Sequence, residues 1–326
     1  MTPDQNIAIV DQSDGLAVFT DVRRKLFGIA YRITGTAADA EDVVQDAWIR
    51  WQLCDRSSVR DATAFLATIV TRLAINVLSS AHTKRETYLG PWLPAPVDTS
   101  DDPALGAERE EALQFATLIL MERLRPAERA AYVLREAFDY PYARIAEVLS
   151  STEVASRKLV SRARKRMADE PGHTEGRDTH RTFLEAFLQA ARAGDTATLE
   201  ALLAADIVSY TDGGGNVRHT ARRPIHGRDK VVRFLAGLSR WFWTDLDLIP
   251  VETNGRPGVF LVNGGELVAA FSVTVRADAI VQLLWMMNPA KLETVARARS
   301  LHAARADWIV PDAAGSTTPE PSSTII

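Results

Sequence analysis

The chain has 326 residues, 46% of them hydrophobic and 25% charged, and a net charge of −4. Its length predicts two or three domains, and its composition excludes a wholly disordered or collagen-like protein. It lacks an apolar run of about 18 residues and a secretory signal pattern, and its single cysteine and scattered histidines predict neither a disulfide nor a metal site. We therefore expect a cytoplasmic protein with no cofactor, no metal and no membrane contact.

Residues 19–85 carry the apolar spacing of three amphipathic helices. Gly35 ends the first helix, Thr36 is placed to cap the second, and a loop at 55–61 precedes the third. The side chains that the third helix is expected to bury are Phe65, Ile69, Leu73 and Val77.

One face of the second helix is acidic. Such a stripe is most often a solvated surface, and acid near a helix N-terminus is stabilising in any case. The functional alternative is a docking face for a basic protein. The residues on this face are Asp39, Asp42, Gln45 and Asp46.

The loop and third helix, at 55–86, are rich in polar and basic side chains. These can read bases or hold the backbone of a single DNA strand, although their spacing alone favours an ordinary surface. Cys54, beside the loop, is expected to be a small packed side chain rather than a redox switch. The candidate DNA-binding residues are Arg56, Arg60, Thr68, Arg72, Asn76, Ser79, Lys84 and Arg85.

Residues 87–107 are predicted to be a linker, because several prolines interrupt any helix there. Tyr88, Trp92 and Leu93 are unusual in a passive connection. We therefore expect these three side chains to dock on another part of the protein.

Residues 108–168 return to helical spacing and end in a helix-turn-helix at 141–168. Pro126 and Pro141 suit helix starts, and Ser150 with Glu153 fits a capping box for the last helix. That helix is strongly basic, and a helical projection places its Arg and Lys side chains opposite Ser156, Leu159 and Ala163. Taken alone, it could be a solvated basic helix or a DNA-recognition helix. The residues that would face DNA are Arg157, Lys158, Ser161, Arg162, Arg164 and Lys165.

The pattern changes class after a second linker at 169–180. Asp212 and the three glycines after it predict a turn between strands. We expect an α+β domain at 181–310 and a disordered tail at 311–326. Its predicted helices span 181–192, 196–203 and 227–238, and its β-like runs span 207–210, 259–262, 267–275 and 280–286.

Four short phrases in the first half carry a family resemblance: Tyr31–Gly35, Asp39–Asp46, Phe65–Ala74 and Leu124–Arg129. They resemble the extracytoplasmic-function (ECF) sigma factors of bacteria. Residues 1–86 are similar to sigma region 2 and residues 108–168 to sigma region 4. The resemblance implies two all-α domains and a non-enzymatic protein that directs core RNA polymerase to promoter DNA and initiates transcription.

The resemblance also implies a role for each surface. The acidic face around Asp42 would dock on the coiled coil of the polymerase β′ subunit, and the β subunit is a further expected contact. The loop and helix at 55–86 would recognise and melt the minus-ten element, with a flipped base held near 56–61. The basic face around Lys158 would contact the minus-thirty-five element.

The C-terminal half resembles SnoaL-like domains, in which a curved sheet and packed helices form a cone. The resemblance rests on the two leading helices, the glycine-rich turn and Pro224–Gly227 before a helix. A subgroup of ECF sigma factors carries such a domain with three motifs that stand here as Tyr88–Pro94, Asp212–Gly215 and Asn288–Leu292, which implies that the domain regulates the sigma regions in cis. The residues implied in regulation are Tyr88, Trp92, Leu93, Asp212, Gly213, Gly214, Gly215, Asn288, Pro289, Lys291 and Leu292.

Two alternatives stay open for this domain. A small-molecule sensor would hold a ligand in an apolar cavity near Trp241, Trp243, Trp285 and Met286, although aromatic side chains are more often core. A polyketide-cyclase-like enzyme would need a buried base, such as a desolvated Asp or His. A filled interior favours regulation alone. The candidate bases, each with an ordinary structural explanation as well, are Asp212, His226 and Asp229.

Overall fold

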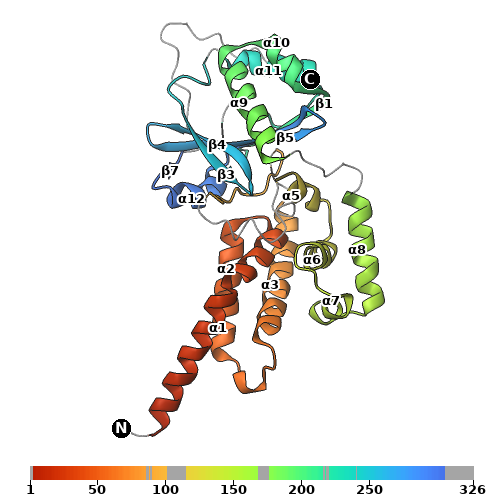
Figure 1. Ribbon diagram of the computed structural model, residues 1–326, viewed down its shortest axis with the longest axis vertical. Helices are drawn as coiled ribbons and strands as arrows, with labels where there is room; N and C mark the ends of the chain where they lie inside the picture. The colour runs from red at the N-terminus through yellow and green to blue at the C-terminus, as the bar shows by residue number, and fades with distance from the viewer. Residues whose placement is uncertain are drawn as a thin grey trace.

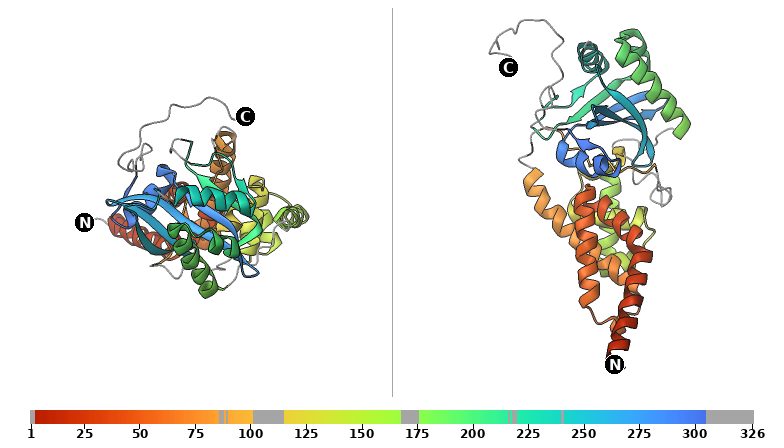
Figure 2. Two further views of the ribbon diagram at one scale, coloured as in Figure 1. Left: turned by 90° about the horizontal axis from the view of Figure 1, so that it is seen from above. Right: turned by 90° about the vertical axis from the view of Figure 1, so that its left-hand side faces the viewer.

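The computed structural model describes residues 3–85, 88, 90–100, 115–167, 176–215, 217, 220–239 and 241–304. Its helical half lies at one end and its sheet at the other (Figures 1 and 2). Part of the linker and the helix α12 (Pro289–Ala298) lie between them. The predicted fold class, two all-α regions followed by an α+β domain, is confirmed. The predicted tail at 311–326 lies outside the described residues.

Three helices form the first group: α1 (Pro3–Thr34), α2 (Ala37–Leu53) and α3 (Ala62–Arg85), with the 3-10 turn η1 (Arg56–Ser58) before α3. Gly35 has a φ of 83° between α1 and α2. Thr36 caps α2 by accepting a hydrogen bond from the Asp39 amide, as predicted. The first helix extends further toward the N-terminus than the apolar spacing indicated.

Helix α3 buries a different face from the one predicted. Phe65, Ile69 and Val77 are only half-buried. The prediction was wrong by about one position, because α3 is apolar around most of its circumference and its neighbours decide which side is covered. The segment Ala62–Ser80 has the length and mean hydropathy (1.5) of a membrane span, but its apolar side chains pack into the helical core. The covered face consists of Leu66, Ala67, Val70, Leu73, Ala74 and Leu78.

The second helical group comprises α5 (Phe115–Met121), α6 (Pro126–Glu136), α7 (Tyr142–Val148) and α8 (Glu153–Met167). The two prolines open α6 and α7 as predicted. The capping box predicted at Ser150 is wrong, because Ser150 has a φ of 50° in the turn and Thr152 instead accepts a hydrogen bond from the Ala155 amide. A single hydrophobic core runs through both helical groups, so they pack as one body.

The C-terminal domain is a seven-stranded mixed sheet with four helices in its described part. The spatial order is β2-β1-β6-β5-β4-β3, with β7 beside β5; β1 runs parallel to β6 and β7 parallel to β5, and the other pairs are antiparallel. The predicted runs fall within β1, β4, β5 and β6, whereas β3 and α12 were not predicted and α9 begins before residue 181. The elements are α9 (Arg177–Ala193), α10 (Thr196–Leu202), β1 (Leu203–Asp212), β2 (Ile225–His226), α11 (Arg228–Leu238), β3 (Asp247–Thr253), β4 (Arg256–Asn263), β5 (Glu266–Arg276), β6 (Ala279–Met286), α12 (Pro289–Ala298) and β7 (His302–Ala303).

The two faces of the sheet are buried by different parts of the chain. Helices α9, α10 and α11 cover one face (Figure 1), over an aromatic core in which the rings of Phe271 and Trp285 lie 4.1 Å apart. The other face packs against α12, against the linker through Leu93 and against α5 through Ile119. The linker and region-4 side of the molecule therefore contribute to the core of the C-terminal domain.

Candidate promoter-binding surfaces and the contacts between domains

The acidic face of α2 lies open to solvent. Asp42, Gln45 and Asp46 are exposed, while Asp39 is half-buried and its carboxylate accepts a 2.6 Å hydrogen bond from the Thr36 hydroxyl. Further along the same face, Ile49 and Leu53 are exposed by 46% and 81%. A row of carboxylates followed by exposed apolar side chains fits a basic, partly apolar helical partner.

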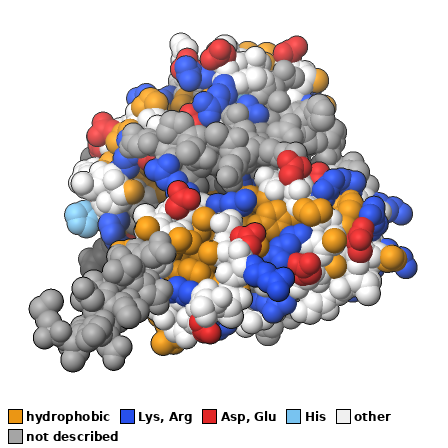
Figure 3. Space-filling view, turned by 60° about the horizontal axis from the view of Figure 1, so that its bottom comes forward, with side chains coloured by type: hydrophobic (Ala, Val, Ile, Leu, Met, Phe, Trp, Pro, Cys, Tyr) orange, Lys and Arg blue, Asp and Glu red, His pale blue; other side chains and the backbone are white. Residues whose placement is uncertain are grey.

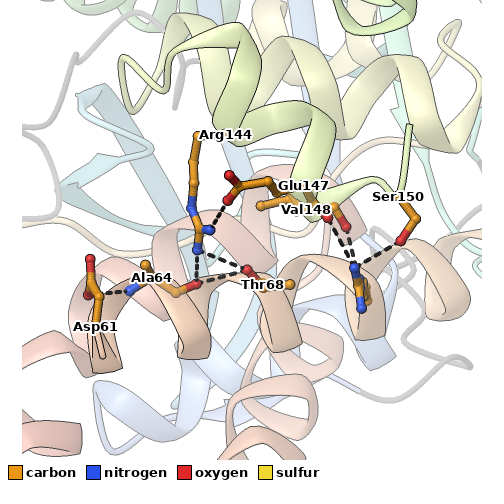
Figure 4. Close-up of polar contacts among 8 residues, drawn as sticks. Asp61, Ala64, Thr68, Arg144, Glu147, Val148 and Ser150 are labelled. Carbon is orange, nitrogen blue, oxygen red and sulfur yellow. Dashed lines mark hydrogen bonds and ion pairs between the residues drawn. The ribbon is translucent and has the colours of Figure 1, made fainter. Parts of the chain in front are cut away.

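Helix α7 of the helix-turn-helix lies on α3 (Figure 4). The Arg72 guanidinium donates hydrogen bonds to the carbonyls of Val148 (2.9 Å) and Glu147 (3.1 Å) and to the Ser150 hydroxyl (2.9 Å). These acceptors stand at the end of α7, where helix carbonyls lack partners within the helix. A cation at that end is also favoured by the helix dipole.

A second arginine donates hydrogen bonds in the opposite direction, from α7 to α3. Arg144 Nη2 donates to the carbonyl of Ala64 (2.6 Å) and to the hydroxyl of Thr68 (3.2 Å), and Arg144 also pairs with Glu147 on its own helix (Figure 4). We call these two sets of bonds the α3–α7 contact. Arg72 and Thr68, both predicted to read the minus-ten element, are thus engaged with the helix-turn-helix.

A fully buried arginine joins the two helical groups at a third point. Arg129 of α6 donates from Nε to the carbonyl of Arg32 at 2.8 Å and pairs with Glu122. The Arg32 guanidinium lies 5.1 Å from the ring centroid of Phe138. Two of the phrases that carry the family resemblance, Tyr31–Gly35 and Leu124–Arg129, therefore meet at this point.

The other minus-ten candidates have varied surroundings. Arg56 lies 5.6 Å from the ring of Trp51 and so close to Gly15 that a Cβ there would meet it at 2.4 Å. Arg56 is thus packed against α1 and α2, not extended into solvent. Lys84 and Arg85 lie outside the described side chains. The exposed candidates of this group are Arg60, Asn76 and Ser79.

Helix α8 presents its basic face outward. Ser156, Val160, Ala163 and Met167 are buried against the rest of the helix-turn-helix, whereas Leu159 is only half-buried. The projection therefore placed the buried and open sides correctly, apart from Leu159. The six exposed polar side chains of this face are Arg157, Lys158, Ser161, Arg162, Arg164 and Lys165.

Several arginines of α8 are paired within the protein. Arg157 pairs with Glu153 and lies 4.6 Å from the ring of Tyr142, and Arg164 pairs with Glu136 at 2.7 Å. Arg162 pairs with Glu128 at 3.0 Å. A view with the bottom of the molecule brought forward shows Lys and Arg side chains interspersed with Asp and Glu on the surface (Figure 3). Within the described residues, Lys158 and Lys165 form no ion pair, which leaves these two ammonium groups as the cations of the face not held by a carboxylate.

The carboxylate of Asp212 is fully buried and gathers the linker onto the C-terminal domain. It accepts hydrogen bonds from the Tyr88 hydroxyl and, at 2.9 Å, from the Leu93 amide. Within its own turn it accepts from the Gly214 amide at 3.1 Å. Sequence reasoning expected Asp212 to shape the turn, and the structure adds its contacts with a segment more than a hundred residues away.

Lys291 of α12 completes this site. Its ammonium donates to Asp212 Oδ2 and to the carbonyl of Leu93, both at 2.6 Å, and lies 3.2 Å from the ring centroid of Trp92. Asn288 caps α12 and donates from Nδ2 to the Tyr88 hydroxyl at 2.8 Å. We call this group the linker cluster. Its members are Tyr88, Trp92, Leu93, Asp212, Asn288 and Lys291.

Glycine and burial both shape the linker cluster. Gly214 has a φ of 67°, and a Cβ there would lie 2.8 Å from the Asn288 side chain, so both the conformation and the space require glycine.

Burial and the neighbouring Asp212 charge raise the pKa of Tyr88 above its ordinary value. The Tyr88 hydroxyl therefore keeps its proton and acts as a donor to the carboxylate.

A second polar contact ties the linker to both halves of the protein. Asn254, in the β3–β4 turn with a φ of 54°, donates from Nδ2 to the Tyr31 hydroxyl at 2.6 Å. That hydroxyl donates to the carbonyl of Ala95 at 2.7 Å. The Val97 amide donates to Asn254 Oδ1 at 3.1 Å, and the Asn254 amide donates to the Val97 carbonyl at 2.9 Å. Burial raises the pKa of Tyr31 above its ordinary value. Asn254-Gly255 is a turn signal in the sequence, but nothing in the sequence indicates its partner on α1.

Aromatic side chains pack against one another in the interior beneath α9–α11. Trp243 and Trp285 are buried there with ring centroids 6.1 Å apart, whereas Met286 belongs to the opposite face of the sheet. The group predicted to line a cavity is therefore divided between two faces. His226 and Asp229, two of the three candidate bases, are exposed and do not line this interior.

Titratable groups inside the C-terminal domain are few. Among its described residues, the buried Asp, Glu, His and Lys side chains are His180, Asp212 and Lys291. Burial lowers the pKa of His180 to about 4, so the imidazole is neutral, and its Nε2 lies 2.6 Å from the carbonyl of Val273. No group of three or more His, Cys, Asp or Glu in the described part of the chain could hold a metal ion.

The chain is similar to several known proteins. The family profile described as Sigma-70 region 2 matches residues 18–83, and that described as Sigma-70, region 4 matches residues 118–167. The ECF RNA polymerase sigma factor SigJ of Mycobacterium tuberculosis is 39% identical over 290 residues, covering 84% of this chain and 91% of SigJ. The probable ECF RNA polymerase sigma factor SigI of the same organism is 28% identical, covering 83% of this chain and 92% of SigI. The crystal structure of M. tuberculosis SigJ matches with a TM-score of 0.70 and 36% identity, covering 85% of this chain and 98% of that chain.

Proposed function

The chain belongs to the ECF RNA polymerase sigma factors, and we propose that its C-terminal domain regulates this activity in cis by holding the two sigma regions closed on each other. As a sigma factor it directs core polymerase to promoters and initiates transcription. The observation that carries the proposed regulation is the buried Asp212 carboxylate, which binds two linker groups and Lys291 at once.

We assign the surfaces of the helical half to three partners. The open face of α2 docks on the polymerase β′ coiled coil, and region 4 is the expected contact for the β subunit. The loop 55–61 and the side of α3 that carries Thr68 and Arg72 bind the minus-ten element, and the exposed face of α8 binds the minus-thirty-five element. In this proposal region 2 spans 1–86, the linker 87–107, region 4 108–168, a second linker 169–180 and the SnoaL-like domain 181–310.

The closed arrangement opposes promoter opening. Arg72 and Thr68 cannot hold a DNA strand while they are bonded to α7 and Arg144. The buried core shared by the two helical groups must also be separated before region 4 can reach an element upstream of the one that region 2 reads. Activity therefore requires that the two regions part.

The linker cluster is suited to controlling that separation. The linker is the covalent connection between the two sigma regions, and it lies between the sheet and region 2 with its polar groups bonded to both. A buried ion pair with satisfied hydrogen bonds is rigid, and removal of one member is costly. A signal that weakens the grip of Asp212 and Lys291 on Leu93 would free the linker and let the regions open.

Run-off transcription with core polymerase tests this proposal. Asn288→Asp keeps an oxygen to cap α12 at the Ala290 amide but removes the Nδ2 donor to Tyr88 and places a charge beside Asp212. Promoter-dependent transcription should rise roughly fivefold or more, since about 1 kcal/mol is a factor of five in an equilibrium. The matched control is Asn263→Asp, a half-buried asparagine at the end of β4 whose Nδ2 donates to the carbonyl of Asp245 at 3.1 Å. It also loses an amide donor, but outside the linker cluster, and should leave transcription unchanged. Equal activity of the two variants and the wild type would remove the linker cluster from regulation.

We propose no enzymatic role for the C-terminal domain, and we favour regulation by contact over the binding of a small molecule. The support is that Asp212 is engaged by the linker and Lys291, that His226 and Asp229 are exposed, and that aromatic rings pack against one another in the interior. A sensor or cyclase would instead need room for a ligand beside an available polar group. Because the protein works with polymerase, we place it in the cytoplasm.

A further inference from the structure

We infer that closure is selective: the closed chain binds core polymerase through α2 but cannot open a promoter, so the protein is held back after polymerase docking rather than before it. This inference rests on the roles proposed above for α2 and α3, and it names the step at which the C-terminal domain acts.

The surface that closure occupies is the α7 side of α3. There Arg72 and Arg144 make their reciprocal bonds, which use the carbonyls at the end of α7 and those of the first turns of α3. Every group in the α3–α7 contact comes from α3, from α7 or from the turn after α7 (Figure 4). Helix α2 contributes nothing to it.

The surface that closure leaves open is on the far side of α3. Helix α2 packs on α1 and α3, and α3 lies between α2 and the helix-turn-helix (Figure 1). Along the outward face of α2 the carboxylates of Asp42 and Asp46 are exposed, and within the described residues neither forms an ion pair. The apolar continuation of this face at Leu53 is 81% exposed. Region 4 covers none of these groups.

Within the described residues, the C-terminal domain faces the first turns of α2 across a groove. A groove of about 380 Å³ separates Ala37 and Glu41 of α2 from Val295 and Ala298 of α12. Glu41, at this edge, is paired with Arg23 at 2.6 Å, whereas Asp42 and Asp46 are exposed and do not line the groove. A helix of opposite charge can therefore lie along Asp42, Asp46 and Leu53 without displacing α12 or the linker.

Charge also distinguishes polymerase docking on α2 from DNA binding at α3. The open carboxylates of α2 can steer a basic polymerase surface toward the closed chain. The α3 side is different, because the Arg72 guanidinium is already held by three oxygen acceptors and a DNA phosphate must compete with them. Polymerase docking adds DNA near α3 at high local concentration, which favours that exchange only after α2 is bound.

A chemical lock tests the inference in the full chain. Ala64→Cys and Glu147→Cys stand on opposite sides of the α3–α7 contact, where both touch Arg144, and Cys54→Ser removes the natural thiol. A short bis-maleimide joins the two new thiols and holds α7 on α3. The same triple variant with each thiol capped separately is the matched control.

Two readouts are compared: anisotropy of the dye-labelled chain with core polymerase, and permanganate reactivity of minus-ten thymines in the open complex. We expect locked and capped proteins to bind core polymerase within about twofold of each other, and the locked protein to lose at least roughly tenfold in open complex. Adding Asp42→Lys and Asp46→Lys to the locked protein should weaken core binding by roughly tenfold or more.

Each alternative result has one meaning. Loss of core binding by the locked protein alone overturns the inference and leaves the proposed function standing. Open complex from the locked protein overturns the occlusion of α3. If the charge reversals leave core binding intact, docking does not use α2. If the capped protein neither binds polymerase nor opens the promoter while the wild type does both, the proposed roles of α2 and α3 fail together with the inference.

Arg144→Ala gives a check without cysteines. Arg144 lies in the contact, outside the face of α2 assigned to the β′ coiled coil and outside the face of α8 assigned to DNA. We expect this variant to form at least roughly fivefold more open complex while its affinity for core polymerase stays within about twofold of the wild type. An equal rise in both quantities would mean that closure blocks docking itself, and would overturn the inference.

Discussion

Replacement of Lys291 by Met should release the linker from the C-terminal domain. Methionine has a similar length but no charge, so the fully buried Asp212 carboxylate loses its 2.6 Å partner while remaining in place. The Leu93 carbonyl loses its donor, and the Trp92 ring loses the ammonium above it. Removing one member of a buried ion pair costs about 3–5 kcal/mol, because the other charge is left uncompensated.

The assay is hydrogen exchange at the linker. The Leu93 amide is protected by its bond to Asp212, so its exchange reports opening of the linker cluster directly. Since each 1.4 kcal/mol is about a factor of ten, the exchange rate should rise roughly a hundred- to several-thousand-fold in Lys291→Met. The amides of β5, which lies in the middle of the sheet, should keep their protection and serve as the internal control.

The double variant Asp212→Asn with Lys291→Met decides whether charge is the cause. It leaves no buried ion, so it should exchange at least roughly tenfold more slowly at Leu93 than Lys291→Met alone. If the two variants exchange equally fast, packing around the Lys291 side chain rather than its charge holds the linker. If Leu93 stays protected in Lys291→Met, the linker cluster does not hold the linker and our reasoning is refuted.

Three further predictions concern other contacts. Asn254→Asp removes the donor to Tyr31, while aspartate tolerates the φ of 54°. The free energy of unfolding, measured by urea denaturation, should therefore fall by about 1–3 kcal/mol. A loss of stability in Asn254→Gly but not in Asn254→Asp would implicate packing rather than the amide. Lys158→Ala should weaken anisotropy-monitored binding of a minus-thirty-five duplex by about 1–3 kcal/mol if it makes a bidentate base contact, and unchanged binding would remove it from the recognition face. Because burial lowers the pKa of His180 from 6.5 to about 4, the unfolded chain binds more protons between these values, and stability should fall by up to about 3 kcal/mol as the pH drops through that window. Thermal unfolding of His180→Gln should lack this dependence; parallel curves for the two proteins would contradict it.

Local features of the helices could be predicted from the sequence because their causes lie within a few residues. The cap at Thr36 and the open face of α8 depend on residues three or four positions apart, and the helix starts at Pro126 and Pro141 depend on the proline itself. The error at Ser150 has a local cause as well. Ser150 and Thr152 both precede a helix, and the backbone path of the turn decides which hydroxyl reaches an amide.

The face of α3 shows where periodicity ceases to discriminate. Its apolar side chains surround most of the helix, so a pattern with several acceptable stripes cannot select one. Packing against α1 and α2 selects the stripe that contains Leu66 and Val70. In the same way, the number of aromatic side chains in the C-terminal domain could not show that Trp285 and Met286 face opposite sides of the sheet.

The amino-acid sequence by itself determined the class of each segment, the order of the sigma regions and the family, since composition, periodicity and short motifs act locally. It also indicated the surfaces that we propose for polymerase and DNA. Only the tertiary structure decided which of those surfaces are engaged. The partners of Arg72, Asp212 and Asn254 lie about 75, 120 and 220 residues away along the chain. No local pattern encodes such pairings, because they exist only where separate elements pack against one another.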